Sequence, residues 1–307
     1  MQPQMQRFAQ PDESCLYILK TAIMRRFMKK SFIFYLSLLI FGSFHDAANA
    51  YVLKGIHILD LMIRNLGKDK RLLVSQKLVF HGSNPERESI ELYETLRYVF
   101  PETFRSDIFS GNTQRINIVS KGIVLTVIDQ KIVTESETKF DYYKDILLYH
   151  SRILIKNRLS LLGVDVSVSS LGRFHDKIAY VIGAEYPEES TSQLWVDKES
   201  FLPIRWLIIG KSGERDDDFL EIRYLKWRKI KKTWYPMRIE LFQNDVLVRE
   251  IKVNNIKVNP FFHKDLFDIR KLKLKCLSAV PVLPSKYESS EFDDVRETIE
   301  DFRKMFE

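Results

Sequence analysis

The stretch from Lys177 to Val258 constrains the fold more than any other part of the chain. At its centre, Gln193–Asp197 and Leu202–Ile209 are apolar runs rich in Trp, Ile and Val, and the short polar segment between them is typical of a β-hairpin. Clusters of Gly, Asn, Asp and Lys interrupt the rest of the stretch in the same way. We therefore expect a succession of antiparallel strands.

Several segments upstream alternate with the period of two that is typical of half-buried strands. The clearest is 88–100, and 71–81, 115–119 and 122–128 follow the same pattern. The apolar side of 88–100 carries Ile90, Leu92, Leu96, Tyr98 and Phe100. These segments predict a wide sheet, and Leu266–Ile269 predicts its last short strand.

Two other segments have helical periodicity. Residues 52–66 carry one apolar stripe and end at Gly67, a natural residue to follow a helix. Apolar residues from Tyr143 to Leu162 predict a second helix over 141–162, with Asp141 as its N-cap and Gly163 after its end. We expect this second helix to cover one face of the sheet; the alternative is a movable cover over a lipid-sized cavity.

Composition shifts at both ends of the chain. Residues 1–50 predict an N-terminal extension and an export signal, with basic Arg25–Lys30, apolar Ser31–Phe41 and a small-x-small site before Tyr51. The apolar run is about eleven residues, shorter than the roughly 20 of a membrane-spanning helix, so we expect a cleaved signal and a soluble periplasmic product. Residues 51–270 then form the main domain. Residues 271–307 are a linker and a terminal amphipathic helix over 291–307, which we expect to pack on its own domain; a helix that docks a partner is the alternative.

Charge, cysteines and motifs exclude several functions. Removal of residues 1–50 takes away six Lys/Arg and three Asp/Glu, lowers the formal net charge from +7 to +4 and leaves the charges interspersed, so we expect no nucleic-acid binding. Cys15 leaves with the signal, and Cys276 alone forms no intrachain disulfide. The sequence has no metal-ligand spacing of His or Cys and no Gly-x-Ser-x-Gly motif, so we expect no metal, no cofactor and no enzyme.

The strand motifs resemble a known family. They are Leu194-Trp-Val-Asp, Leu202-Pro-Ile-Arg, Trp234-Tyr-Pro-Met-Arg and the Asn-rich strand Ile251–Asn259, and with the export signal and the short N-terminal helix they resemble the LolA-like periplasmic carriers and outer-membrane lipoprotein-sorting proteins. The resemblance covers about 51–269. It implies a mainly β (α+β) fold of the LolA/LolB type, an incomplete antiparallel β-barrel covered by helices, with an apolar cavity that shields acyl chains in transit.

The resemblance also suggests site residues. In the family, an Arg on an early strand hydrogen-bonds the helical lid and is linked to its opening; Arg115 is the matching position, although Gln114 and Ile116 replace the family's aromatic neighbours. An ordinary surface Arg is the alternative. Apolar alternation on the strands and helical spacing on 141–162 suggest a cavity lining; the candidates, each of which could equally be an ordinary core residue, are Leu125, Ile153, Leu154, Leu194, Val196, Trp206 and Tyr224.

These observations lead to two hypotheses. The first is a soluble, monomeric periplasmic carrier or binder of acylated lipoproteins or other acylated lipids, which hides acyl chains for transfer to the outer membrane and meets partner proteins at the inner and outer membranes. The alternative is a regulatory or stress-sensing envelope protein that binds a protein partner through the same fold. The absence of a catalytic motif favours either over an enzyme.

Overall fold

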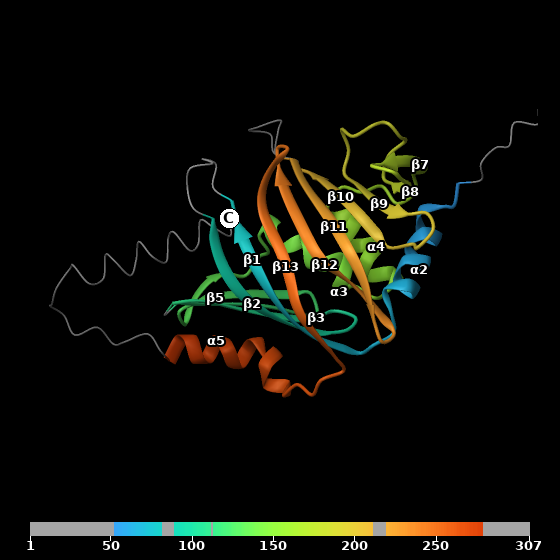
Figure 1. Cartoon of the computed structure of the whole chain (residues 1–307). Coiled ribbons are helices and arrows are strands. Elements are labelled where there is room, and N and C mark those ends of the chain that lie inside the picture. Colours follow the sequence, from blue (N-terminus) through green and yellow to red (C-terminus); the bar gives the residue numbers. More distant parts are fainter. Residues whose placement is uncertain (1–51, 82–88, 112, 211–218, 279–307) are drawn as a thin grey trace, which may run out of the picture. The chain divides into compact units, whose positions relative to one another are not determined.

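The computed structural model describes residues 52–81, 89–111, 113–210 and 219–278 (Figure 1). Within these ranges, thirteen strands form one antiparallel sheet. Its first half contains β1 Arg71–Phe80, β2 Ile90–Val99, β3 Thr103–Ser110, β4 Thr113–Ser120, β5 Ile123–Ile128 and β6 Lys131–Thr134. Its second half contains β7 Ser169–Phe174, β8 Lys177–Ile182, β9 Gln193–Asp197, β10 Pro203–Ile209, β11 Phe219–Ile230, β12 Thr233–Gln243 and β13 Val246–Val258.

Each strand pairs with its neighbours in sequence within each half of the sheet. The exception is the pairing of β1 with β13, which joins the two halves, so that β6 and β7 are the two edges. The sheet is therefore open between β6 and β7. This order confirms the predicted incomplete antiparallel barrel.

Tight turns set the register of the predicted central strands. Asn244 and Asp245, with φ of 50° and 64°, join β12 to β13, and a turn with φ > 0 at both central residues matches the twist of the flanking strands. Between β9 and β10, the Asp197 carboxylate accepts hydrogen bonds from the amide and hydroxyl of Ser200, both at 2.7 Å. The predicted strands from Lys177 to Val258 are all present, as β8 to β13.

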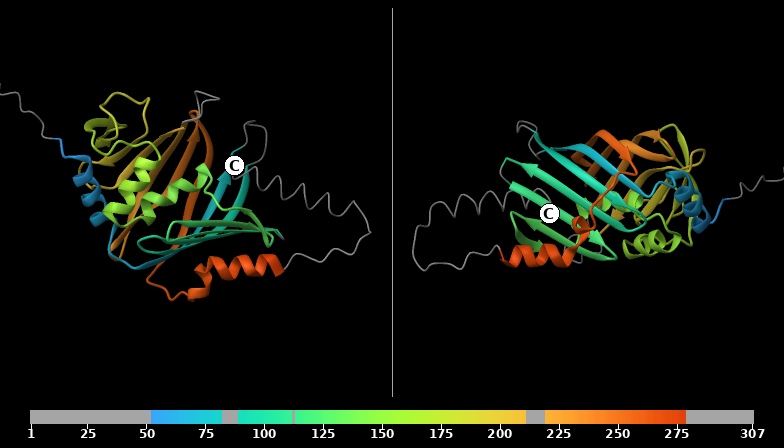
Figure 2. Two further views of the ribbon diagram at one scale, coloured as in Figure 1. Left: turned by 180° about the vertical axis from the view of Figure 1, so that it is seen from behind. Right: turned by 90° about the horizontal axis from the view of Figure 1, so that it is seen from below.

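The connection between the two sheet edges is helical. It contains the 3-10 helix η1 Lys139–Lys144, α3 Asp145–Leu148 and α4 Arg152–Leu161. Helix α2 Gly55–Leu66 packs beside α4, β12 and β8, and it confirms the predicted N-terminal helix. We call the face of the sheet beneath α2, η1, α3 and α4 the inner face (Figure 2).

The predicted continuous helix over 141–162 is wrong, because the chain leaves the helical conformation in its middle. Tyr149 has ψ of 82° and Ser151 is extended, with φ of −139° and ψ of 134°. Helix α4 therefore begins with a new register at Arg152. Asp141 lies inside η1 and is not an N-cap, whereas Gly163, with φ of 86°, follows α4 as predicted.

Two other elements differ from the expectation. Strand β3 has no counterpart among the predicted segments, because the inward alternation of Phe104 and Ile108 is interrupted by Ser106. The predicted strand Leu266–Ile269 is instead the end of the 3-10 helix η2 Lys264–Phe267 and the start of helix α5 Ile269–Ser278. The predicted export signal and terminal helix lie outside the described residues.

Apolar side chains gather on both faces of the sheet. The large core lies on the inner face and includes Leu194, Trp206, Tyr224 and the buried residues of α2, α3 and α4. On the opposite, outer face, α5 covers Ile116, Ile118, Leu125 and Val127. A third cluster on the outer face surrounds Trp195. None of the described helices is long and apolar enough to span a membrane.

Candidate functional site

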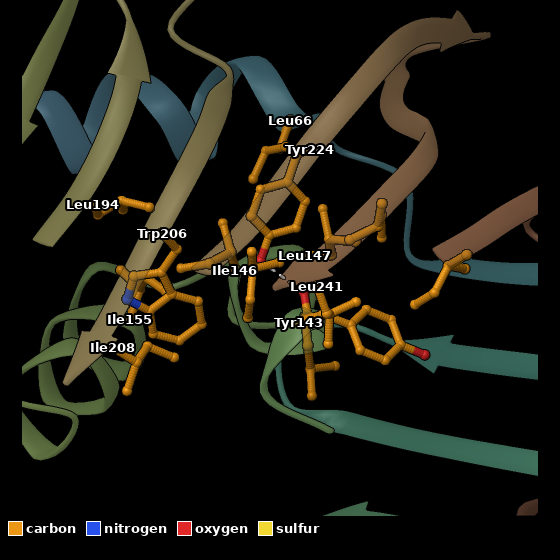
Figure 3. Close-up of a cluster of buried hydrophobic side chains, with 14 of the residues drawn as sticks. Leu66, Tyr143, Ile146, Leu147, Ile155, Leu194, Trp206, Ile208, Tyr224 and Leu241 are labelled. Carbon is orange, nitrogen blue, oxygen red and sulfur yellow. Dashed lines mark hydrogen bonds between the residues drawn. The ribbon is translucent and has the colours of Figure 1, made fainter. Parts of the chain in front are cut away.

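The apolar half of the inner face lies under α3 and α4. Strands β9 to β12 contribute Leu194, Trp206, Tyr224 and Leu241, which are at most 1% exposed, and the helices place Ile146 and Ile155 against them at 0% exposure (Figure 3). The Tyr224 hydroxyl donates a hydrogen bond of 2.9 Å to the Tyr143 carbonyl. Helical side chains therefore cover the apolar surface of these strands.

A pocket of about 250 Å³ opens at the margin of this core. Strands β10 and β11 and the ends of η1 and α4 line it, with the residues Lys139, Tyr142, Leu161, Leu162, Ile208, Ile209, Gly210 and Leu220. It is smaller than the ~300–1,000 Å³ of typical ligand sites. A long acyl chain would therefore fit only if the neighbouring helices moved.

Within the described residues, one polar group of the apolar half of the inner face is buried without a hydrogen-bond partner. Trp206 is 0% exposed, and its Nε1–H finds no acceptor among the described residues. An indole N–H that is buried in this way normally has a partner, because an unmade bond costs ~1–3 kcal/mol. Trp206 lies beside Ile155 and Ile208 in Figure 3. Ile208 also lines the pocket, whereas Trp206 lies behind the lining residues.

The other half of the inner face, from β1 to β5, carries a buried polar cluster among apolar side chains such as Leu96 and Ile108. The Glu94 carboxylate accepts hydrogen bonds from Ser106 Oγ and Gln76 Nε2, both at 2.5 Å, and from the Tyr143 hydroxyl at 3.2 Å. Burial raises the pKa of Glu94 despite these donors. Next to it, Asn117 donates to Thr126 at 2.9 Å. Among these hydrogen bonds, the one from the Tyr143 hydroxyl to Glu94 joins η1 to the sheet.

Arg115 makes the second link between the sheet and η1. From β4, its Nη2 lies 2.8 Å from Asp141 Oδ2, and the two side chains are only 2% and 9% exposed. Thr138 Oγ1 donates to the same carboxylate oxygen at 2.9 Å. Burial opposes ionisation of Asp141, but the Arg115 guanidinium and the Lys144 ammonium outweigh it and hold the pKa of that carboxyl below its usual range.

A compact ion-pair network ties η1, α3 and α4 together. Lys144 Nζ lies 2.6 Å from Glu137 Oε1, and Arg158 Nε donates to Asp145 Oδ2 at 2.6 Å. Arg158 also pairs with Glu137. The side chains of Lys144 and Asp145 are at most 1% exposed, and the surrounding carboxylates raise the pKa of Lys144 against the opposing effect of burial. Buried charges thus link the three helical elements to one another, and apolar side chains of α3 and α4 pack them on the sheet.

The structure brings together four of the seven suggested lining residues. Leu194, Val196, Trp206 and Tyr224 share the inner-face core. Leu125 lies on the outer face under α5, because alternation along β5 turns it away from its neighbours Val124 and Thr126. Ile153 is 67% exposed. Leu154 is half-buried, and the break before α4 makes Ile155 the residue that enters the core instead.

Sequence reasoning missed most of the buried polar cluster on β1 to β5. Glu94 lies on the same side of its strand as Leu92, Leu96 and Tyr98, so the signal was a single carboxylate within an apolar stripe. Lys144 and Asp145 were similarly hidden in a segment interpreted as an amphipathic helix. Arg115 was named through the family resemblance, and it does contact η1. Within the described ranges, no group of three or more His, Cys, Asp and Glu side chains could hold a metal ion.

Comparison with known proteins identifies the fold class. No family model and no curated protein sequence matches the chain. Three solved structures do match: a domain of a putative outer membrane lipoprotein-sorting protein from Vibrio parahaemolyticus (10% identity, TM-score 0.50, covering 72% of this chain and 98% of that one), a LolA superfamily protein from Nitrosomonas europaea (14%, 0.50, 70% and 99%), and a DUF1329 family protein from Desulfovibrio piger (10%, 0.51, 71% and 97%).

The chain therefore has an open antiparallel half-barrel with helices on its inner face. This is the LolA-like fold that the sequence motifs predicted. At these identities, the comparison establishes the fold, and the function rests on the site.

Proposed function

We propose that this protein is a soluble periplasmic carrier or binder of acylated lipoproteins or other acylated lipids. The observation that carries the proposal is the helical segment from η1 to α4, which crosses between the open sheet edges and covers an apolar inner face with an unpartnered Trp206 N–H. An acyl chain needs an apolar surface and few polar groups, and the ester or amide carbonyl of an acylated ligand could accept a hydrogen bond from Trp206 Nε1.

The energies of the exchange are close to balance. Burying an acyl chain of about sixteen carbons removes some fifteen CH₂ groups from water, at ~0.8 kcal/mol each, or ~12 kcal/mol. Helices α3 and α4 have five buried apolar side chains, which contribute ~1.5–3 kcal/mol each, or ~7.5–15 kcal/mol; they are Ile146, Leu147, Leu148, Ile155 and Leu159. An acyl chain that takes the place of these side chains restores the free energy that is lost when they leave the inner face. Near-balance is what reversible loading and release require.

The buried charges set how the cover moves. Breaking the pair between Arg115 and Asp141 would leave two charges away from water, which is costly. We therefore infer that η1 stays on the sheet and that Arg115 acts as a positioning residue for the cover. Helices α3 and α4 move away only when the pairs of Lys144 with Asp145 and of Arg158 with Glu137 break, which sets the cost of opening. The proposed partners are the acylated ligand and membrane proteins that load and unload it; the proposal includes no catalysis, metal or nucleic acid.

Fluorescence quenching tests the proposal. The probe is a diacylglyceryl peptide with brominated acyl chains, added to the chain that begins at Tyr51. Trp227 and Trp234 also pack against the inner-face core, so both are replaced by Phe in every variant. Because Trp206 lies in that core and Trp195 lies on the outer face, we expect saturable quenching that Trp206→Phe largely removes and Trp195→Phe retains. Native mass spectrometry of protein purified from periplasm should show the lipid load.

Two outcomes would count against the proposal. The first is quenching that never saturates, and the second is quenching that is equal in the Trp206→Phe and Trp195→Phe variants. Capture of a specific envelope protein by a chain that carries no lipid would instead favour the regulatory alternative.

A further inference from the structure

Helix α5 is apolar on two opposite sides. Ile269 and Cys276 face the sheet and are 8% and 4% exposed. Leu274 and Leu277, on the outward side, are 68% and 65% exposed. A helix that only covered the sheet would carry polar residues on the outward side. The two leucines therefore mark a face that is suited to a further partner.

The same helix has an excess of positive charge. It carries Arg270, Lys271, Lys273 and Lys275 and no acidic residue. Lys273 pairs with Glu135 of the loop after β6 at 2.7 Å, and Lys271 pairs with Asp265 of η2. Arg270 precedes Leu274 by four residues and Leu274 precedes Leu277 by three, so one outward stripe combines a cation with the two leucines. An acidic amphipathic partner would match this stripe.

The chain contains such a segment beyond α5. Residues 291–307 include seven acidic and three basic residues. Their apolar residues recur at alternating intervals of three and four, which is typical of a helix that packs against another helix; they are Phe292, Val295, Ile299, Phe302 and Phe306. The segment therefore has a net negative charge and an apolar stripe, and both are complementary to the outward face of α5.

We propose that the acidic segment 291–307 packs as an amphipathic helix against the outward face of α5, with Leu274 and Leu277 in its apolar stripe. The connection 279–290 has twelve residues and spans up to ~40 Å when extended, and α5 is only ~15 Å long. Pro281 and Pro284 in this connection are residues that do not continue a helix. An anionic lipid surface would also attract a basic amphipathic helix. The tethered segment is favoured, because a short linker holds it at a millimolar effective concentration beside the face.

Zero-length crosslinking tests this proposal on the full chain from Tyr51. Carbodiimide joins lysine amines to carboxylates, and mass spectrometry of an equal mixture of ¹⁴N- and ¹⁵N-labelled protein separates links within one chain from links between chains. We expect links within one chain between the α5 lysines and the carboxylates of 291–307. Leu274→Asp/Leu277→Asp should abolish them, while Ile153→Asp, at an equally exposed position of α4 (67%), should leave them intact.

Four results would overturn the proposal. The first is the absence of these links. The second is their persistence at full yield in Leu274→Asp/Leu277→Asp, which would mean that the tether alone brings the groups together. Links found only between differently labelled chains would assign the face to a second copy. Sedimentation of the full chain with phosphatidylglycerol vesicles, lost in Leu274→Asp/Leu277→Asp, would assign it to lipid. The proposal does not depend on what the inner face binds.

Discussion

At the scale of single residues, the pair formed by Arg115 and Asp141 is the main test of how the cover is held. Both side chains are almost fully buried. Removing one partner leaves the other charged and away from water, so Arg115→Met should lower the free energy of unfolding by about 3–5 kcal/mol. The double variant Arg115→Met/Asp141→Leu should lose less than Arg115→Met alone. Urea unfolding measures both.

The control for this prediction is an exposed pair on the same sheet. Lys77 and Glu91, with side chains 26% and 47% exposed, lie 2.9 Å apart. Lys77→Met should lower the free energy of unfolding far less than Arg115→Met, because water screens an exposed pair. Similar losses in Arg115→Met and Lys77→Met would show that the buried pair does not hold η1.

The lowered pKa of Asp141 predicts a dependence on pH. Its folded-state pKa lies below the ordinary value of 3.8, so the folded state favours the carboxylate. The resulting stability is fully present above the unfolded pKa and is lost as the pH falls through the folded pKa. Below about pH 4, the free energy of unfolding should therefore fall more steeply in the natural chain than in Asp141→Asn. Parallel curves from pH 7 to pH 3 would contradict this prediction.

The individual inner-face residues could be predicted from the sequence only in part. Alternation placed Leu194, Val196, Trp206 and Tyr224 on one face, because period-two patterns survive in regular strands. The same reasoning did not show which face of β5 is inner, so Leu125 was grouped with residues on the opposite side. Glu94 was overlooked, because alternation carries no information about the donors that make a buried carboxylate tolerable.

At the scale of elements, the length and patterning of each segment decided whether it was predicted. Helix α2 and strands β8 to β13 have strong periodicity and clear turn residues. The break between α3 and α4 has no Gly or Pro to mark it; only Ser151, a residue type that often precedes a helix, lies at the junction. Tertiary packing sets this break, since it lets the buried Leu147 and Ile155 both face the sheet.

Helix α5 provides a prediction at the same scale. Cys276 lies on the sheet-facing side of α5 and is 4% exposed, and burial raises the pKa of its thiol. In the chain from Tyr51, Ellman's reagent should therefore react with Cys276 only slowly. Leu272→Asp, which disturbs the contact between α5 and β4–β5, should speed the reaction at least tenfold while the far-ultraviolet circular dichroism spectrum stays unchanged.

The matched control moves the thiol to an exposed position of another helix. In Ile153→Cys/Cys276→Ser, the new thiol occupies a position of α4 that is 67% exposed in the natural chain and should react rapidly without Leu272→Asp. Rapid labelling of Cys276 in the natural chain would show that α5 does not cover the outer face.

At the scale of the whole described unit, the pairing of β1 with β13 makes one sheet from two series of hairpins. The sequence predicted most strands of both series, but not β3 or β7, and the family resemblance predicted that they form a half-barrel. Local alternation does not show that β1 pairs with β13, because these strands lie far apart in the sequence. The same holds for the buried polar cluster of the inner face, whose members come together only when β1–β5 lie side by side.

The central claim is that α3 and α4 occupy the place of an acyl chain. Hydrogen-exchange mass spectrometry of the chain from Tyr51, with and without a diacylglyceryl peptide, tests it most directly. We predict that the amides of 145–161 lose protection when the ligand binds, while those of β11 to β13 stay protected. If the ligand binds and 145–161 keep or gain protection, the helices are a fixed part of the core and the claim is wrong.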